Sequence, residues 1–330
     1  MKKVLILSDG RAGHFNQSLA VAEAMKTLEE TENIYLEVKV RKVSKYILRF
    51  LLNSKMGQQL FRAAPSAKMI NIFYKQYDWE GRPDIIISSG KDTSLLNVML
   101  SLMYGSKNIF IGNPKKLNHH LFTKIMTVLD LGFDNQIVLD VAPTSSYKGD
   151  LSSFIHKYKL DKKVQYYTLL VGGDGAGYTF EDEEIRNIIS FVNRIDQVQW
   201  LVSTSRRTAK LYEGKMKKEM KTACFIDFNI NPEKVVSGFL ELSTAVFVTE
   251  ESASMLSESI ASKKSVFTLV PKQYKPEKNY KSIIQKFVKE KSIERVEILA
   301  LKTFEIHLNT LSEKKISSLE EIALKLGKIL

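Results

Sequence analysis

Short apolar runs alternate with longer amphipathic stretches along the chain, in two successive series. Runs of five or six apolar residues that end at turn residues predict strands buried on both faces of a parallel sheet. Stretches with apolar positions three and four residues apart predict the helices that cover such a sheet. In the first series we expect strands at residues 4–8, 35–40, 84–88, 108–112 and 136–140, and helices at 16–28 and 93–103.

The second series repeats this arrangement after a polar stretch at residues 143–163, which predicts a linker. We therefore expect two α/β domains, residues 1–150 and 151–330. The stretch from Ser312 is predicted to be helical, and the sequence does not decide whether it packs back on the first domain. Strands are expected at residues 166–171, 199–203, 224–228, 245–249 and 265–270, and helices at 182–195, 208–218, 232–242, 253–261 and 279–289.

Composition narrows the class of protein. Hydrophobic residues make up 44% of the chain and charged residues 26%, which is ordinary for a globular protein with a real core. The apolar run after Met1 is too short for a secretory signal, and no apolar stretch approaches the length of a membrane span. The single cysteine, Cys224, excludes an internal disulfide and a cysteine-based metal site. We expect a cytoplasmic protein.

The net charge of +12 requires an explanation. Residues 39–75 hold basic and bulky apolar residues in alternation and no acidic residue, which suits the surface of an anionic membrane. The alternative is a set of ordinary helices that pack their apolar faces on a sheet, within a generally Lys-rich surface. Zinc-finger spacing, aromatic RNA-binding strands and arginine-rich tails are all missing, so nucleic acid is not an expected partner.

Polar residues and glycines follow the first predicted strand. Parallel sheets bind ligands at the carboxyl ends of their strands, and glycines there allow a ligand to approach the backbone. A histidine in such a place is a candidate site residue, although Asn16 has a simpler role as a helix N-cap. The motif is no G-x-G-x-x-G fingerprint, and no acidic residue closes the second strand at Val40, so a dinucleotide site is disfavoured. The candidates are Asp9, Gly10, Arg11, Gly13, His14, Asn16 and Gln17.

Gly90 and Lys91 follow the strand at residues 84–88 in the same way. Lys91 is a candidate for contact with an anionic ligand. The equally good alternative is a glycine turn in which Asp92 caps the next helix.

Three candidate elements end strands of the second series. Gly172 and Gly173 open a loop with four glycines in six positions, which suits a backbone that lies against phosphate or sugar. A basic turn follows the next strand, where two arginines suit a diphosphate and a solvated surface turn is the alternative. A small-residue helix start then offers bare amides to a phosphate, with Glu258 two turns further on. These two elements comprise Ser205, Arg206, Arg207 and Thr208, and Glu250, Ser252, Ser254, Met255 and Glu258.

Taken together, residues 8–19, the turn at residues 204–208 and the segment at residues 249–258 resemble the mitochondrial fission ELM1 family, whose bacterial members are described as glycosyltransferases. That family is similar to GT-B enzymes of the MurG type. The resemblance implies a GT-B fold, with two Rossmann-like domains whose parallel sheets face a central cleft. Residues 1–150 would then be the acceptor side and residues 151–330 the nucleotide-sugar side, although the loop at residues 172–177 departs from the family's form.

The resemblance also implies roles for single residues. Glu258 would hold the nucleotide ribose, with Glu250 at the Glu-x7-Glu spacing of many GT-B donor sites. Arg206 and Arg207 would meet the donor diphosphate. His14 or Asp9 would act as the general base if the reaction inverts the sugar's configuration. No metal or other cofactor is expected, because the chain has no convincing Asp-x-Asp motif at a strand end and GT-B enzymes typically work without one.

The expected function is transfer of a sugar from a nucleotide sugar to a membrane-associated glycolipid or cell-envelope polysaccharide, with a nucleoside diphosphate as product. The protein would then work at the inner face of the cytoplasmic membrane. One alternative is a non-catalytic membrane adaptor, since plant relatives are associated with the fission machinery. A second is an NAD-dependent nucleotide-sugar epimerase, which the missing G-x-G-x-x-G and Tyr-x-x-x-Lys motifs argue against.

Overall fold

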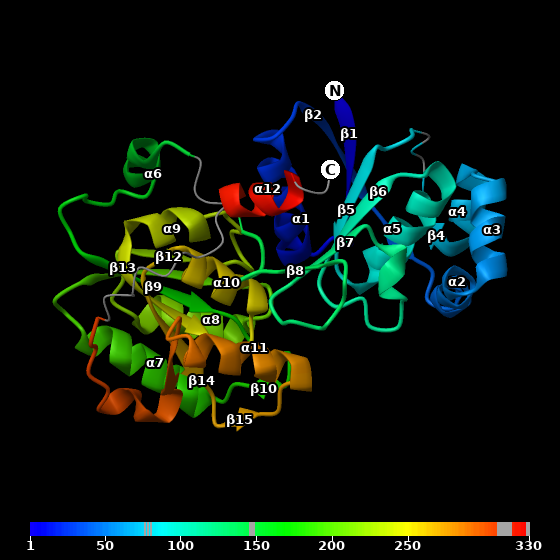
Figure 1. The fold of residues 1–330 in the computed structure, drawn as a ribbon. Coiled ribbons are helices and arrows are strands. Elements are labelled where there is room, and N and C mark those ends of the chain that lie inside the picture. Colours follow the sequence, from blue (N-terminus) through cyan, green and yellow to red (C-terminus); the bar gives the residue numbers. More distant parts are fainter. Residues whose placement is uncertain (76, 78, 80, 145–148, 309–318, 328–330) are drawn as a thin grey trace. The chain divides into compact units, whose positions relative to one another are not determined.

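The computed structural model describes residues 1–75, 77, 79, 81–144, 149–308 and 319–327. The chain divides into two compact units. Unit 1 combines Met1–Ser145 with Ile316–Leu330, and unit 2 is Ser146–Lys315. The division falls five residues before the boundary expected at residue 150, and the final helix belongs to unit 1. Figure 1 shows both units as α/β structures, and each is described below by itself.

Unit 1 is built on a six-stranded sheet in which every pair of neighbours is parallel. The strand order is β2-β1-β5-β6-β7-β8. Buried β-branched and aromatic residues fill the central strands, as both faces are covered. The strands are β1 (Lys2–Ser8), β2 (Thr31–Glu37), β5 (Ile85–Ser89), β6 (Lys107–Ile111), β7 (Lys124–Thr127) and β8 (Gln136–Val138).

Helices cover both faces of this sheet. Alternate residues of β1 point to opposite faces, so Val4 and Ile6 pack in one core cluster while Leu5 and Leu7 pack in the other. The first cluster lies under α1 (Ala12–Lys26) and α12 (Leu319–Gly327), which lie against each other. The second lies under α2 (Ser44–Asn53), α3 (Lys55–Ala63), α4 (Ala67–Phe73) and α5 (Lys91–Tyr104).

Smaller elements complete unit 1. The two-residue strands β3 (Lys39–Val40) and β4 (Tyr74–Lys75) pair in antiparallel fashion at the two ends of the segment that carries α2, α3 and α4. A 3-10 turn, η1 (His119–Leu121), precedes β7. No helix among the described residues is both long enough and apolar enough to cross a bilayer.

Unit 2 has a second six-stranded parallel sheet, with the order β12-β11-β9-β13-β14-β16. Its central strand β9 is buried along its whole length. A separate antiparallel pair is formed by β10 (Tyr178–Thr179) and β15 (Gln273–Tyr274). The strands of the large sheet are β9 (Tyr166–Val171), β11 (Gln199–Thr204), β12 (Cys224–Ile226), β13 (Ser243–Thr249), β14 (Ser265–Val270) and β16 (Glu294–Glu297).

Two core clusters again lie on the two faces of the sheet. The larger, aromatic cluster packs α7 (Asp182–Arg194), α8 (Lys210–Glu219) and η2 (Ile298–Lys302) around Trp200 and Phe247. The smaller cluster packs α6 (Leu151–Lys157) and α9 (Val236–Leu242) through Phe154 and Phe239. The remaining helices of the unit are α10 (Ala253–Ala261) and α11 (Lys278–Lys289).

The ten expected strands are all present. The pattern missed β7 and β16 of the two large sheets, and it did not predict the two-residue strands β3, β4, β10 and β15. In β16 only Val296 is buried, because the strand lies at the sheet's edge and so carries almost no apolar signal. In β7 the run is only four residues long. The expected linker also contains the helix α6. The side chain of Asp150 caps the N-terminus of this helix.

Three local expectations need correction. The strand β2 ends at Glu37, so an acidic residue does close it, whereas the sequence argument ended it at Val40. Helix α1 begins at Ala12, four residues earlier than expected, so Asn16 lies inside the helix and is not its N-cap. Gly90 precedes α5 as its N-cap, so Asp92 is not the cap. Of the helix expected from Ser312, residues 312–318 lie outside the described residues, as do residues 145–148 of the linker.

Candidate functional site

Each sheet has one point at which the strand order reverses direction. In unit 1 the chain passes from β1 outward to β2 on one side and to β5 on the other. In unit 2 it passes from β9 to β11 on one side and to β13 on the other. Such switch points open a crevice beyond the carboxyl ends of the strands, where α/β proteins bind ligands. The candidate residues therefore belong to two separate edges.

The switch point of unit 1 holds a carboxylate–imidazole pair. Asp9 follows β1, and its Oδ2 lies 2.9 Å from Nδ1 of His14 in the first turn of α1. Gly90, which follows β5, lies against this pair with φ +96°. A Cβ on Gly90 would lie 2.3 Å from His14 Nδ1, so only glycine leaves room for the pair. The adjacent strands β1 and β5 thus bring Gly90 beside Asp9, 81 positions earlier in the chain.

Electrostatics favour an ionised Asp9. Burial opposes ionisation, but the hydrogen bond with His14 and the amide of Arg11 outweigh it and hold the carboxyl pKa below its usual value. With Nδ1 facing Asp9, the other ring nitrogen of His14 has no hydrogen-bond partner among the described residues. A carboxylate that orients an imidazole in this way makes the free nitrogen a candidate general base.

The other residues predicted for this site lie at different positions around the switch point. Gln17 accepts a hydrogen bond of 2.7 Å from Ser89, which ties α1 to the end of β5. Gly10 has φ +77° and lies beside the carboxylate of Glu37, at the end of β2. Arg11 and Lys91 are exposed at the starts of α1 and α5, while Gly13 and Asn16 lie within the first turns of α1.

The switch point of unit 2 is built around a buried carboxylate, Glu251. Its Oε1 accepts hydrogen bonds from the amide of Gly173 at 3.1 Å and from Arg207 at 3.2 Å. A Cβ on Gly172 would lie 1.5 Å from that same oxygen, so this glycine makes space for the carboxylate. The other oxygen, Oε2, is buried without a hydrogen-bond partner. Burial, against the opposing effect of Arg207, raises the pKa of Glu251 to about 7.

The basic turn after β11 divides into structural and exposed parts. The Thr208 hydroxyl donates to the carbonyls of Val171 and Gly172 and so holds the turn against the glycine loop. Ser205 Oγ accepts a hydrogen bond from the amide of Arg207, within the turn itself. Arg207 is committed to Glu251. Arg206 is exposed, and no hydrogen bond or ion pair engages its side chain within the described residues.

Glu250 is held entirely by the protein. Its carboxylate is fully buried and receives Arg295 Nε at 2.6 Å and Nη2 at 2.8 Å. Tyr178 donates to it at 2.8 Å and Thr268 at 3.1 Å. These four hydrogen bonds indicate that Glu250 serves packing and charge pairing. The expected role of Glu250 in binding the nucleotide-sugar donor stays a prediction.

Helix α10 starts beside this switch point. Ser252 is its N-cap without a side-chain cap bond, and Ser254 and Met255 are half-buried in the first turn. Glu258 lies one turn further on, half-buried, and no hydrogen bond or ion pair engages it within the described residues. Burial raises its pKa to about 7. A carboxylate in this state is available to a ligand's hydroxyl groups.

Sequence reasoning missed Glu251 and Glu37 as residues of these edges. The sequence carried a signal for Glu251, since it stands next to Glu250 directly after β13. Alternation along the strand does not extend past the strand end, so the pattern did not say which glutamate faces the glycine loop. In the described residues one group of metal-ligating side chains occurs, His119, His120 and Asp134, and it lies at neither switch point.

Comparisons with known proteins identify the fold and the family. The family described as "Mitochondrial fission ELM1" matches residues 12–327. No curated protein matches the chain. Among solved structures, the Escherichia coli ADP-heptose LPS heptosyltransferase II is similar over 99% of this chain and 98% of that chain, with 10% identity and a TM-score of 0.50.

Two further solved structures are similar over nearly their whole length. The UDP-GlcNAc 2-epimerase of Methanocaldococcus jannaschii has a TM-score of 0.56 at 11% identity. The match covers 100% of this chain and 99% of that chain. The glycotransferase of kitacinnamycin has a TM-score of 0.51 at 11% identity. The match covers 99% of this chain and 94% of that chain. Identities this low show the GT-B fold alone, which serves transferases and epimerases alike.

Proposed function

We propose, on the premise that this chain belongs to the mitochondrial fission ELM1 family, that it is a glycosyltransferase that uses a nucleotide-sugar donor. The observation that carries the proposal is the switch point of unit 2. There a glycine loop, the turn with Arg206 and Arg207, and the start of α10 follow three neighbouring strands of one sheet. Loops of that kind at the carboxyl ends of parallel strands suit a nucleoside diphosphate.

The protein offers a suitable partner for the phosphate charges of the donor and another for its ribose hydroxyls. Arg206 is exposed and available to a diphosphate, which planar guanidinium groups bind through two hydrogen bonds. The first amides of α10, behind Ser252 and Ser254, offer further donors to phosphate oxygens. The Glu258 side chain has no hydrogen bond or ion pair among the described residues and suits the ribose diol. No metal is required in this proposal, because the arginine and the helix amides offset the phosphate charge.

The acceptor chemistry is assigned to unit 1. The free nitrogen of His14 takes the proton of the acceptor hydroxyl as that oxygen attacks the anomeric carbon of the donor sugar. The bond from the anomeric carbon to the diphosphate oxygen breaks, and the nucleoside diphosphate leaves with the bonding electrons. Asp9 holds the imidazole in position and stabilises its protonated form.

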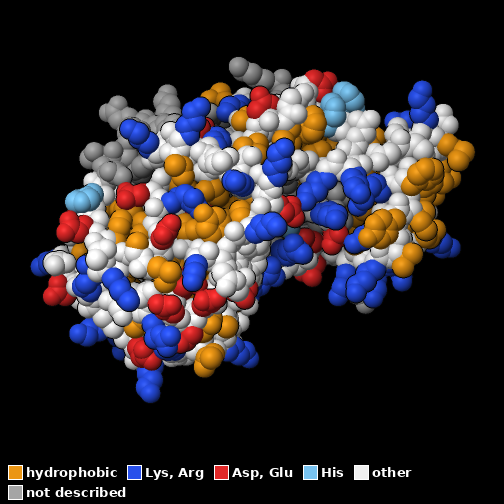
Figure 2. All heavy atoms as spheres, turned by 90° about the horizontal axis from the view of Figure 1, so that it is seen from below, with side chains coloured by type: hydrophobic (Ala, Val, Ile, Leu, Met, Phe, Trp, Pro, Cys, Tyr) orange, Lys and Arg blue, Asp and Glu red, His pale blue; other side chains and the backbone are white. Residues whose placement is uncertain are grey.

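A membrane-bound acceptor is supported by the surface of α2, α3 and α4. This surface exposes Tyr46, Ile47, Phe50, Met56, Leu60 and Ile72. Figure 2 shows hydrophobic side chains interleaved with Lys and Arg at the end of unit 1 that carries these helices. Because residues 39–75 contain no acidic residue, apolar insertion and attraction to anionic lipid act together there. We propose that these helices bind the cytoplasmic membrane that holds a glycolipid acceptor.

The donor proposal is tested by binding of nucleotides to the full-length protein. Calorimetry with UDP, GDP, ADP and CMP, and with the corresponding nucleotide sugars, should give binding to one nucleoside diphosphate. Arg206→Ala and Glu258→Gln should each weaken that binding by about tenfold or more, the usual loss for a charge-assisted contact. Arg186→Ala and Glu183→Gln, which change exposed residues of α7, are the matched controls.

The outcomes separate the candidate functions. Binding that is lost in both site variants, with transfer of the sugar to a lipid extract, supports the transferase. Binding with conversion of the sugar and no acceptor product indicates an epimerase. Absence of binding to every nucleotide at millimolar concentration contradicts the donor site and favours the adaptor.

The membrane proposal has its own measurement. Co-sedimentation with vesicles that contain anionic phospholipid should retain the protein, and Phe50→Ser should release it. Leu211→Ser in α8 is the control, because Leu211 is 76% exposed and Phe50 is 73% exposed. Equal retention of all three proteins, or retention on neutral vesicles only, would contradict the role of this surface.

A further inference from the structure

A second group of chemically active side chains lies at the opposite edge of the unit 1 sheet. His119 and His120 form the 3-10 turn η1, three residues before β7, and Asp134 lies two residues before β8. Because all strands of the sheet are parallel, this group lies at the amino ends of the strands. The Asp9 and His14 pair lies at the carboxyl ends. The two groups are therefore separate.

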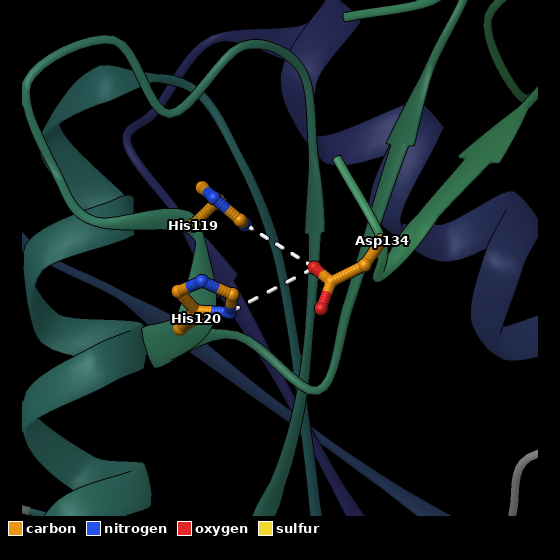
Figure 3. A group of neighbouring side chains, drawn as sticks. All are labelled: His119, His120 and Asp134. Carbon is orange, nitrogen blue, oxygen red and sulfur yellow. Dashed lines mark ion pairs between the residues drawn. The ribbon is translucent and has the colours of Figure 1, made fainter. Parts of the chain in front are cut away.

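The ligand atoms of the three residues converge on one point. Figure 3 shows the Nδ1 atoms of both imidazoles facing the same oxygen, Oδ1 of Asp134. The distances are 3.5 Å from His119 and 3.7 Å from His120, and all three ligand atoms lie within 4.8 Å of one another. Both distances exceed the usual N–H···O hydrogen bond of about 2.7–3.2 Å.

The separation matches shared metal ligation. Zinc–nitrogen and zinc–oxygen bonds of about 2.0–2.2 Å, at tetrahedral angles, place neighbouring ligand atoms about 3.4 Å apart. His119 Nδ1 is buried and has no hydrogen-bond partner within the described part of the chain, whereas buried polar atoms ordinarily have one. A cation among the three residues would satisfy it.

The protein holds the ligands in place without any ion. The ring of His119 stacks on Phe133, with centroids 4.4 Å apart and planes 6° from parallel. Asn135, next to Asp134, donates hydrogen bonds to the carbonyls of His119 and Phe122 at 2.8 and 2.7 Å. The side chain of Asn118 accepts the amide of His120. These contacts join η1 to the β7–β8 loop, so little ordering is left to be done on binding.

We propose that His119, His120 and Asp134 bind one divalent transition-metal ion of the zinc class, with water completing the coordination. Two imidazoles and a carboxylate are ligands that Zn²⁺ prefers, and they do not suit Mg²⁺ or Ca²⁺, which favour oxygen. The ion links η1 to the β7–β8 loop and so stabilises the outer strands of the sheet. Its place is structural, since it lies at the edge away from the sugar-transfer residues.

The test uses metal-stripped, full-length protein and Zn²⁺ alone. Calorimetry should show one equivalent of Zn²⁺, and the melting temperature should rise with its concentration. His120→Asn and Asp134→Asn should each weaken binding by at least about 100-fold, more than is usual for a residue that only supports a ligand. Both side chains are largely exposed, at 63% and 70%, so both variants should fold. Co²⁺ in place of Zn²⁺ should give the visible absorption of a low-coordinate site, which both variants lose.

The matched control is His156→Asn, which removes an exposed histidine of α6 in unit 2. This variant should bind Zn²⁺ as the unaltered protein does. Absence of stoichiometric binding would overturn the proposal. Binding of equal strength in His120→Asn and Asp134→Asn would also overturn it, since the ion would then be held elsewhere on the surface.

Discussion

Both sheets place a carboxylate beside a glycine at the switch point, and the two carboxylates have opposite protonation preferences. Burial leaves only 8% of the Asp9 side chain exposed and opposes its ionisation, but hydrogen bonds from His14 and the amide of Arg11 lower the pKa of its carboxyl. Glu251 also faces an amide and a guanidinium, but its burial dominates and its pKa rises to about 7. Asp9 follows β1 and Glu251 follows β13, so the carboxylate and the glycine exchange strands between the two switch points. The carboxylate is an anion in unit 1 and a titrating group in unit 2.

The difference extends to the neighbouring charges. In unit 2 the buried carboxylate of Glu250 pairs with Arg295, whose side chain is 33% exposed. In unit 1 the pair is Asp9 and His14, and its imidazole remains accessible. We therefore expect that altering the pair in unit 2 lowers the free energy of unfolding. Altering the pair in unit 1 should instead lower catalytic activity. The predictions below test this contrast.

The largest loss of stability is expected for Arg295→Met. It leaves Glu250 buried without its cation, which costs about 3 kcal/mol of the free energy of unfolding. Denaturant unfolding measures it, with Arg186→Met as control. Arg186 pairs with Asp182 on an exposed helix face, and its loss should cost at most about 0.5 kcal/mol. Equal losses in the two variants would show that Glu250 does not depend on Arg295.

Gly172→Ala should cost about 2 kcal/mol, because the new Cβ displaces the Glu251 carboxylate from Gly173 and Arg207. The control is Gly214→Ala in α8, where a Cβ meets nothing within 4 Å. That change should leave the protein as stable or stabilise it by up to about 1 kcal/mol. Melting temperatures of the two variants are the measurement, and a stable Gly172→Ala protein would contradict the close packing of Glu251.

His14→Gln should change the free energy of unfolding by less than about 1 kcal/mol, since it removes one hydrogen bond at a partly exposed site. If the proposed transfer reaction is correct, the same change lowers kcat by about 100-fold or more, the usual contribution of a general base. His156→Gln is the control for both measurements. A stability loss as large as that of Arg295→Met would mean that unit 1 uses its pair as unit 2 does.

The last prediction concerns the pH dependence of stability. The pKa of Glu258 rises from about 4.3 in an unfolded chain to about 7 in the folded protein. Between these values the folded state binds more protons, so the free energy of unfolding falls as pH rises. Glu258→Gln should make that fall between pH 5 and 8 shallower, and Glu251 should account for part of the remainder. Glu183→Gln in α7 should leave the slope unchanged.

The sequence predicted much of the fold because a strand buried on both faces forms a continuous apolar run, which is visible in the sequence. The expected β9 and β14 have the observed bounds, and the expected α10 does too. It missed β16, where an edge position leaves one buried residue and hence almost no pattern. It also placed the start of α1 too late, because the helix begins with Ala12 and Gly13, ahead of its first apolar residue at Phe15.

The candidate sites were predicted less completely. The glycine loops and arginines could be placed at strand ends because strand ends are visible in the sequence. The direction of a side chain after the strand was not visible, so Glu250 was chosen as a donor residue while Glu251 faces the glycine loop. The convergence of His119 and His120 with Asp134 depends on how the β7–β8 loop folds back, which local pattern does not encode.

The return of α12 to unit 1 bears on the order in which the protein is made. Ile322, Ala323 and Leu326 pack under α1, in the same cluster as Val21 and Met25. During synthesis these residues leave the ribosome after all of unit 2, so the first unit must wait with an apolar surface uncovered while the second is completed. Until α12 has been made, the first unit therefore exposes the apolar surface that α12 covers.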